Sequence, residues 1–194
     1  MVYVQYGCGS SAPEGWLNFD ASLKERLGIR GKCFLARCAM ATLYEGCRLR
    51  WHRQSCLRVP YSRTPDPSRF ETALRNTWRI LILGGTFRRI MPDLETGAVA
   101  YLRRLRNGML DANDHFMDGI GERRPRNFLT HMRSFFGHGR HYWLWDFAST
   151  KTALERSGFQ KIRRCKYGDN PDPMFGLVEN KDRFVWAVSV ECVK

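Results

Sequence analysis

The sequence lacks any apolar run of about 18 residues, the length that a membrane-spanning helix needs, and its mean hydropathy is −0.45. It also lacks a basic leader followed by an apolar segment, because residues 1–6 run directly into glycine. These two absences predict a protein that does not insert into membranes and that resides in the cytoplasm.

Closely paired cysteines are absent as well. The seven cysteines form an odd set without an export signal, which favours reduced thiols over a disulfide framework. They are Cys8, Cys33, Cys38, Cys47, Cys56, Cys165 and Cys192. Structural zinc sites usually bring their ligands in pairs such as C-x2-C, so we expect no bound metal.

Acidic residues are few, with 19 aspartates and glutamates against 32 lysines and arginines and a net charge of +13. This charge attracts polyanions in general, including nucleic acid, acidic lipids and phosphorylated glycans. It does not indicate which of them the protein binds. Runs such as residues 123–126 are more typical of solvated loops than of a nucleic-acid-binding face.

Internal repeats and low-complexity linkers are also absent, and the length fits a single domain over residues 1–194. Within it, residues 31–67 show no period of 2 or 3.6 and contain three prolines near their end, so we expect them to be irregular. Residues 107–142 are long, basic and aromatic, which predicts an insertion.

The amino-terminal residues alternate between strand and helix signals. Residues 2–6 predict a short strand that ends in a tight glycine turn, and residues 16–19 predict a second strand. Asp20 is placed to cap a helix over residues 21–27. This order indicates an α/β sheet.

The remaining sequence continues this pattern. We expect helices over residues 68–82, 92–106 and 149–157, and strands over residues 86–91, 160–167 and 184–193. The second of these helices should turn Leu94, Ala98, Tyr101, Leu102 and Leu105 inward. The last two strands are separated by turn residues and could pair as an antiparallel hairpin.

The stretch Gly7-Cys8-Gly9 is the first candidate for chemistry. Glycines at the carboxyl end of a strand let the backbone approach a ligand closely, and a carboxylate after the next strand, here Asp20, can bind two ribose hydroxyls. The third glycine of G-x-G-x-x-G is replaced by Ala12, so the motif alone is weak, and Asp20 could equally be only a helix cap.

Four segments together resemble the class I S-adenosylmethionine-dependent methyltransferases, in particular a small bacterial subgroup. They read VQYGCGSSAPEGWLNFDAS, ALRNTWRILILGGTFRRIMPDLE, WLWDFASTKTALERSGFQKIRRCKYGD and DPMFGLVE. The resemblance implies a Rossmann-like, mostly parallel α/β sheet that a C-terminal antiparallel hairpin closes. It also implies S-adenosylmethionine as cofactor and a small-molecule or glycan acceptor.

The resemblance assigns the cofactor site to Tyr6, Gly7, Cys8, Gly9, Ser10, Asp20 and Ala21. In the family, the glycine loop cradles the methionine part of the cofactor and the acid after the second strand binds its ribose. The chain departs from the family where Gln5 replaces an acid and where Ile82-Leu83 replaces Lys-Pro. It departs again within residues 31–67, whose arginines and prolines argue against the buried parallel strand expected there.

The sequence assigns no catalytic base. Surface roles are favoured for His138 and His141, and packing roles for Trp143, Trp145 and Phe147. Methyl transfer depends on alignment and needs a base only when the acceptor must lose a proton.

Three other functions stay open. An inactive methyltransferase-like interaction module is one, a basic nucleic-acid-binding protein is the second, and a nicotinamide-dependent reductase is a distant third.

Overall fold

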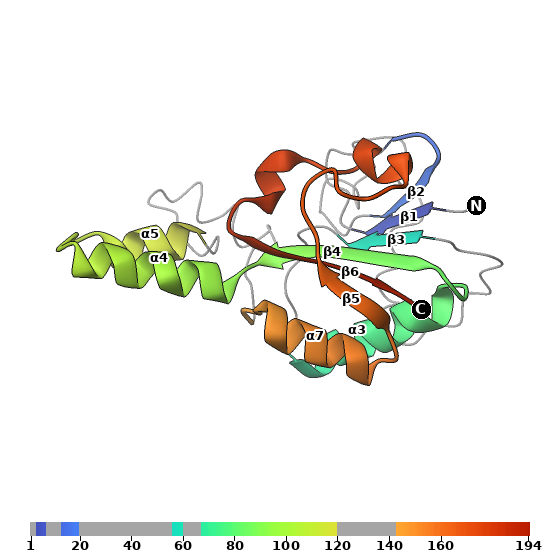
Figure 1. Ribbon diagram of the computed structural model, residues 1–194, viewed down its shortest axis with the longest axis horizontal. Helices are drawn as coiled ribbons and strands as arrows, with labels where there is room; N and C mark the ends of the chain where they lie inside the picture. Colours follow the sequence, from blue (N-terminus) through green and yellow to red (C-terminus); the bar gives the residue numbers. More distant parts are fainter. Residues whose placement is uncertain (1–2, 7–12, 20–55, 60–66, 120–142) are drawn as a thin grey trace, which may run out of the picture.

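The computed structural model describes residues 3–6, 13–19, 56–59, 67–119 and 143–194, which form one sheet with flanking helices (Figure 1). The strands are β1 (Tyr3–Tyr6), β2 (Trp16–Phe19), β3 (Cys56–Val59), β4 (Thr86–Pro92), β5 (Gln160–Arg164) and β6 (Ala187–Val193). They lie in the order β2-β1-β3-β4-β6-β5. The expected α/β class is confirmed.

Strand direction divides this sheet into two parts. The neighbours β2, β1, β3 and β4 run parallel, whereas β6 runs antiparallel to both β4 and β5. The two final strands are shorter than the expected ranges, since the chain leaves β5 after Arg164 and enters β6 at Ala187.

Strand β3 corrects the expectation that residues 31–67 supply no parallel strand. The chain pairs in parallel there with β1 on one side and β4 on the other. Four residues without an internal proline suffice, because the ladder is made by backbone groups, and Pro60 follows directly after Val59. The rest of that segment lies outside the described residues.

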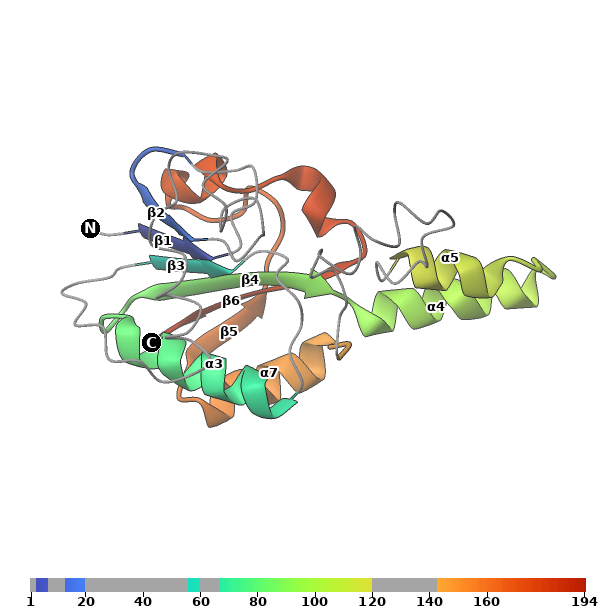
Figure 2. The same cartoon turned by 180° about the vertical axis from the view of Figure 1, so that it is seen from behind.

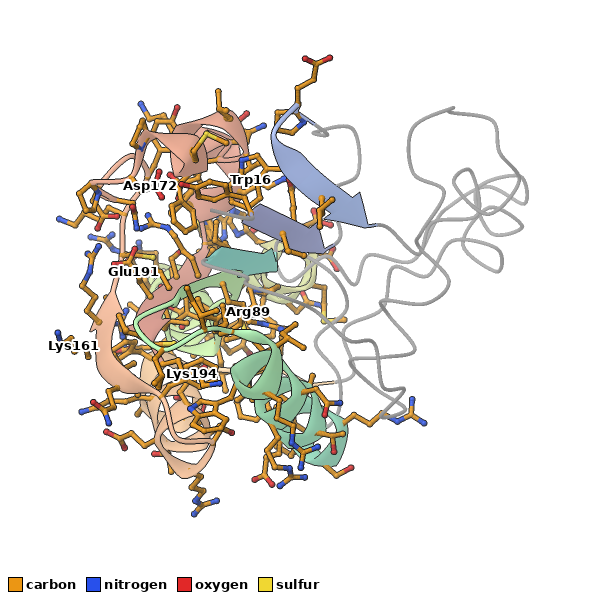
Figure 3. All side chains as sticks on the ribbon, turned by 90° about the vertical axis from the view of Figure 1, so that its right-hand side faces the viewer. Trp16, Arg89, Lys161, Asp172, Glu191 and Lys194 are labelled. Atoms are coloured by element: carbon orange, nitrogen blue, oxygen red, sulfur yellow. The ribbon has the colours of Figure 1, made fainter. Side chains whose placement is uncertain are left out.

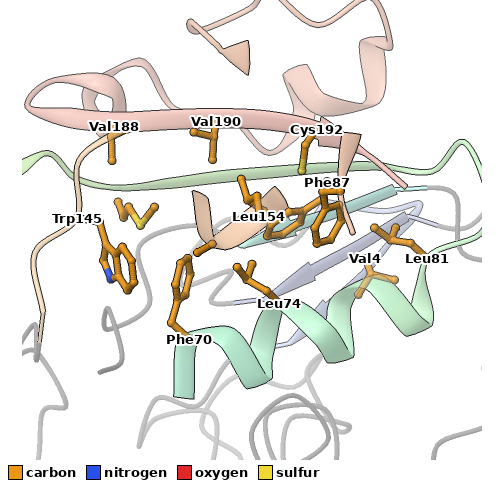
Figure 4. Close-up of a cluster of buried hydrophobic side chains, with 13 residues drawn as sticks. Val4, Phe70, Leu74, Leu81, Phe87, Trp145, Leu154, Val188, Val190 and Cys192 are labelled. Atoms are coloured by element: carbon orange, nitrogen blue, oxygen red, sulfur yellow. The ribbon is translucent and has the colours of Figure 1, made fainter. Parts of the chain in front are cut away.

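Helices α3 (Pro67–Ile80) and α7 (Phe147–Arg156) cover one face of the sheet, as Figures 1 and 2 show from opposite sides. Both agree with the expected helices to within two residues. The capping box between Asp146 and Ser149 fixes the start of α7. The main core lies between these helices and the strands, where Phe70 and Leu74 meet Val4, Phe87 and the apolar side chains of β6 (Figure 4).

The opposite face is covered by residues 165–186, which connect β5 to β6 and which we call the strap. It contains two short 3-10 helices, η1 (Pro173–Leu177) and η2 (Lys181–Phe184). A second, smaller apolar cluster forms where Phe175 and Val178 of the strap pack with Trp16. In Figure 3, the labelled Trp16 and Asp172 lie on this side, and Arg89 and Lys194 lie toward the helices.

Helices α4 (Leu94–Arg106) and α5 (Ala112–Gly119) form a hairpin that projects beyond the sheet (Figure 1). We call residues 94–119 the arm. The predicted inward face of α4 is wrong at Leu102 and Leu105, which are about half exposed, and only Gly97 of this helix is fully buried. The helix packs on α5, through Tyr101 and Phe116 for instance, instead of on the sheet.

Two predictions fall wholly or partly outside the described residues, namely the helix over residues 21–27 and, of the insertion expected over residues 107–142, the part from 120 to 142. Within the part that the structure does describe, no helix is both long and apolar enough to cross a membrane.

Candidate functional site

The four parallel strands end at one edge of the sheet, their carboxyl edge. The last residues of β1 and β2, Tyr6 and Phe19, are register partners, and β3 ends beside them at Val59. The partner of Val59 in β4 is Arg89, and β4 continues for three more residues to Pro92. In open α/β sheets, ligands bind outside this edge, where the strand order reverses. Here the order reverses at β1, which lies between β2 and β3.

Most of the predicted cofactor residues follow this edge directly in the sequence. Tyr6 is the last residue of β1. The others, Gly7, Cys8, Gly9, Ser10, Asp20 and Ala21, lie outside the described residues, and their assignment stays a prediction.

Gln5 is an unusual side chain near this edge. It is fully buried in the penultimate position of β1, and neither its amide nitrogen nor its amide oxygen has a hydrogen-bond partner in the described part of the chain. An unpaired buried amide costs about 1 to 3 kcal/mol, and such groups call for an explanation such as a ligand. The sequence signalled Gln5 only as a departure from the family's acid.

The end of β4 is fixed by a second set of contacts. Asp93 caps α4 by accepting from the backbone N–H of Glu95 at 3.1 Å and from the hydroxyl of Thr96 at 2.7 Å. Its own N–H donates to the carbonyl of Trp186 at 3.0 Å. Asp93 is therefore the N-cap of α4, and the helix begins two residues later than the expected start at residue 92.

Trp186 joins this edge to the arm. Its φ of 58° lies in the left-handed region, which non-glycine residues rarely adopt. Its ring lies 5.4 Å from the ring of His115, and a Cβ on Gly119 would lie 3.0 Å from it. The absence of a side chain at Gly119 thus lets α5 approach the tryptophan. Composition and spacing gave no signal for this junction.

The other aromatic residues near this edge fill structural roles. Trp145 is buried in the main core, with its ring 4.3 Å from that of Phe70, and Phe147 packs against the same core. Trp143 is half exposed. The packing predicted for Trp145 and Phe147 is therefore confirmed, whereas His138 and His141 lie outside the described residues.

A cluster of ionic side chains lies under the strap. The fully buried guanidinium of Arg88 contacts Asp169 at 2.6 Å, Glu179 at 2.7 Å and Glu191 at 2.5 Å, and it donates to the carbonyl of Lys166 at 2.6 Å. We call Arg88 and these three acids the ionic cluster. Burial alone would lower the pKa of Arg88, but its neighbours outweigh burial and raise it.

Asp169 is the acid of the ionic cluster whose pKa shifts clearly. Burial opposes its ionisation, but the backbone N–H of Lys166 and the guanidiniums of Arg163 and Arg88 lower its pKa to about 2. The strap is therefore held to the sheet by a charged network around Arg88, which ties β4 to residues about eighty to a hundred positions later.

Metal or thiol chemistry finds no support in this region. Among the residues that the structure describes, no three histidine, cysteine or acidic side chains gather as metal ligands. Cys165 and Cys192 are free and buried, and burial raises the pKa of both thiols, that of Cys165 to about 12. Neither is a ready nucleophile near neutral pH.

Comparison with known proteins identifies the fold of the chain through solved structures alone. No family model matches the sequence, and no curated protein matches it. Many solved structures match the chain in their fold. This is the fold of the class I S-adenosylmethionine-dependent methyltransferases.

One such structure is a SAM-dependent methyltransferase from Archaeoglobus fulgidus, with a TM-score of 0.53, 12% identity, and coverage of 99% of this chain and 85% of that one. The methyltransferase SibL, in its apo form, gives 0.52 at 12% identity over 100% of this chain and 50% of its own. A possible exported protein from Bordetella parapertussis gives 0.51 at 16% identity, with 100% and 61% covered. The chain thus spans only about half the length of SibL.

Proposed function

We propose that the chain binds S-adenosylmethionine at the carboxyl edge of β1 and β2 and transfers its methyl group to a small-molecule or glycan acceptor. The observation that carries this proposal is the buried, unpaired amide of Gln5 near the end of β1, two residues before Gly7 of the glycine loop. Solved methyltransferases of the same fold, at 12% identity, support the cofactor.

The backbone register supports the grouping of the predicted site. Tyr6 and Phe19 are partners on adjacent strands, and Gly7 and Asp20 are the next residues in the sequence. A carboxylate at position 20 and glycine N–H groups at positions 7 and 9 are suited to a ribose and an amino-acid carboxylate, respectively. The amide of Gln5 offers both a donor and an acceptor to the same ligand.

Bound S-adenosylmethionine would supply a methyl group on a positively charged sulfur. The contribution of the chain would be to hold the cofactor with Gln5, the glycine loop and Asp20 and to align the acceptor with it. Alignment can supply much of the rate of such an in-line displacement. No residue is assigned as a base.

The test is calorimetric titration of the protein with S-adenosylmethionine and S-adenosylhomocysteine. Asp20→Ala should weaken binding by about 1 to 3 kcal/mol, the cost of an unsatisfied polar partner. Asp114→Ala, which changes an exposed aspartate of α5, is the matched control and should leave binding unchanged. Micromolar binding that only Asp20→Ala weakens would justify an acceptor screen.

Absence of binding by a folded sample would contradict the proposal and would favour the noncatalytic interaction module. The net charge of +13 keeps a nucleic-acid-binding role as a further alternative. Sequence preference that persists when salt is added would support that role, whereas binding that salt abolishes without preference would be electrostatic background.

A further inference from the structure

The outer side of α4 carries an uncovered stripe of four residues. Glu95, Val99, Leu102 and Arg106 follow one another at intervals of four, three and four residues, which places them on one side of a helix, as in the seam of a coiled coil. Val99 is 62% exposed and Leu102 is 47% exposed. Glu95 and Arg106 are exposed at the two ends of the stripe.

Apart from its Asp93 cap and its contact with α5, the described residues cover little of this helix. Of its thirteen residues only Gly97 is buried, and its partner α5 has eight residues. Helices of this length are marginal in water unless an apolar face is packed. More apolar side chains, Leu105, Met109 and Leu110, are exposed farther along the arm. Burial of these exposed apolar side chains by a binding partner would therefore stabilise the arm.

The stripe is complementary to itself. Its four positions are symmetric about the point between Ala100 and Tyr101, so a second α4 that runs antiparallel places each Val99 opposite a Leu102. The same register places each Glu95 opposite an Arg106, twice in the pair. An acid at the amino end and a base at the carboxyl end also agree with the helix dipoles, which oppose each other favourably in antiparallel helices.

The charged ends are available for such a contact. Arg106 has no ion-pair partner among the described residues. Glu95 contacts Arg164 at 2.7 Å, but both side chains are more than half exposed, and such surface pairs contribute little. Because the arm projects beyond the sheet in both views, a second molecule has access to it (Figures 1 and 2).

We propose that this face of α4 binds α4 of a second copy of the chain, antiparallel and about a two-fold axis. Such an interface is isologous, which is the commonest symmetry of soluble oligomers. One helix of thirteen residues per copy makes a small interface, so the dimer should be weak and dependent on concentration. The proposal does not depend on the proposed cofactor.

The experiment is analytical ultracentrifugation of the whole protein over a wide range of concentration. The wild type should show a monomer–dimer equilibrium, and Leu102→Asp should abolish it by placing two carboxylates in the apolar centre. A wild type that stays monomeric throughout would overturn the proposal. So would a dimer that Leu102→Asp leaves intact, because the interface would then lie elsewhere.

The register is tested by charge exchange. Glu95→Arg and Arg106→Glu should each weaken self-association about tenfold, since like charges then meet at both ends. An equimolar mixture of these two variants should restore association, because each mixed pair regains opposite charges. Failure of the mixture to associate would overturn the antiparallel register.

Two matched controls distinguish the role of the stripe from effects of net charge and of the Arg164 contact. Arg164→Ala removes the surface contact of Glu95 without changing the stripe, and Arg79→Glu makes the same charge change on α3. Both should associate as the wild type does. A loss of association in either would show that net charge or the Arg164 contact, and not the seam, controls self-association, and would count against the proposal.

Discussion

The two faces of the sheet are held by different forces. The face under α3 and α7 is packed with apolar side chains, including Phe87 and Val190, whereas the face under the strap is held by charges around Arg88. The helices and the strap pack on opposite faces of the same strands. Successive residues of β4 point to opposite faces, so this strand contributes to both contacts. One sheet thus combines an apolar contact that is insensitive to pH with an ionic contact that is not.

On the face under the strap, which we call the polar face, Arg88 and Glu191 are register partners. The backbone register continues this row across the sheet, with Arg58, Gln5 and Asn18 on one side and Arg163 on the other. We call these six positions the polar row. In a sheet buried on both sides, such a row is unusual, since central strands are commonly near-continuously apolar.

The apolar face is not free of charge, because Arg89 points toward it. Its guanidinium lies 4.8 Å from the centre of the Phe70 ring, at the carboxyl half of β4. A cation over an aromatic face is one way to bury a guanidinium. The two faces therefore differ in what stabilises them most, which is apolar burial on one face and ionic contacts on the other. Substitutions can test each face separately.

The largest expected effect is on the polar face. Arg88→Met should reduce the free energy of unfolding by about 3 to 5 kcal/mol, because it leaves the buried acid Glu179 and its neighbours without their cation. Urea unfolding would measure it. If this variant does not fold, Glu179→Gln gives a milder test. A loss below about 1 kcal/mol would mean that the strap is held mainly by its apolar residues.

On the apolar face, Leu154→Ala should cost about 3 kcal/mol, the loss of a fully buried leucine plus the cavity that it leaves. The same urea unfolding at several pH values would compare the two faces. The cost should be independent of pH below the alkaline range, since the core cluster of Leu154 consists of apolar side chains and the thiol of Cys192, whose pKa burial raises. A cost that changed with pH would show that the faces are coupled.

The sequence predicted the apolar face far better than the polar one. The helical spacing of Phe70, Leu74 and Thr77 marks the buried side of α3 because one helix face repeats locally. The ionic cluster joins Arg88 to acids that are far away in the sequence, and only the register of β4 and β6 brings them together. No local period contains that information.

The same difference explains the errors at β3 and α4. At β3 the surrounding arginines and prolines argued against a buried parallel strand. Four residues are nevertheless enough to form the backbone hydrogen bonds of a strand. At α4 the apolar residues do have helical spacing, but spacing does not say what covers them. For the candidate site, the sequence identified the loop residues through resemblance, and Gln5 gained its significance only from its burial.

A smaller effect is expected at acid pH. The pKa of Asp169 is lowered to about 2 from an ordinary value of 3.8, so its ionised form stabilises the fold above about pH 4. This stability should be lost as the pH falls from about 4 to 2, and after solvent screening we expect about 1 to 2 kcal/mol. Asp169→Asn should flatten this part of the pH profile, as measured by urea unfolding. An unchanged profile would place the acid sensitivity in other carboxylates.

The smallest expected effect on stability is at Gln5, where a substitution should increase the free energy of unfolding but weaken the binding of S-adenosylmethionine. Gln5→Leu removes an unpaired buried amide and keeps an apolar side chain of similar size, so the free energy of unfolding should rise by about 1 kcal/mol. Binding of S-adenosylmethionine should weaken, because the amide no longer offers its donor and acceptor. A buried group kept only for packing would give no loss of binding. If instead Gln5→Leu destabilises the protein and leaves binding intact, the amide has a structural partner, and the polar row, rather than a ligand, explains its place in the sheet.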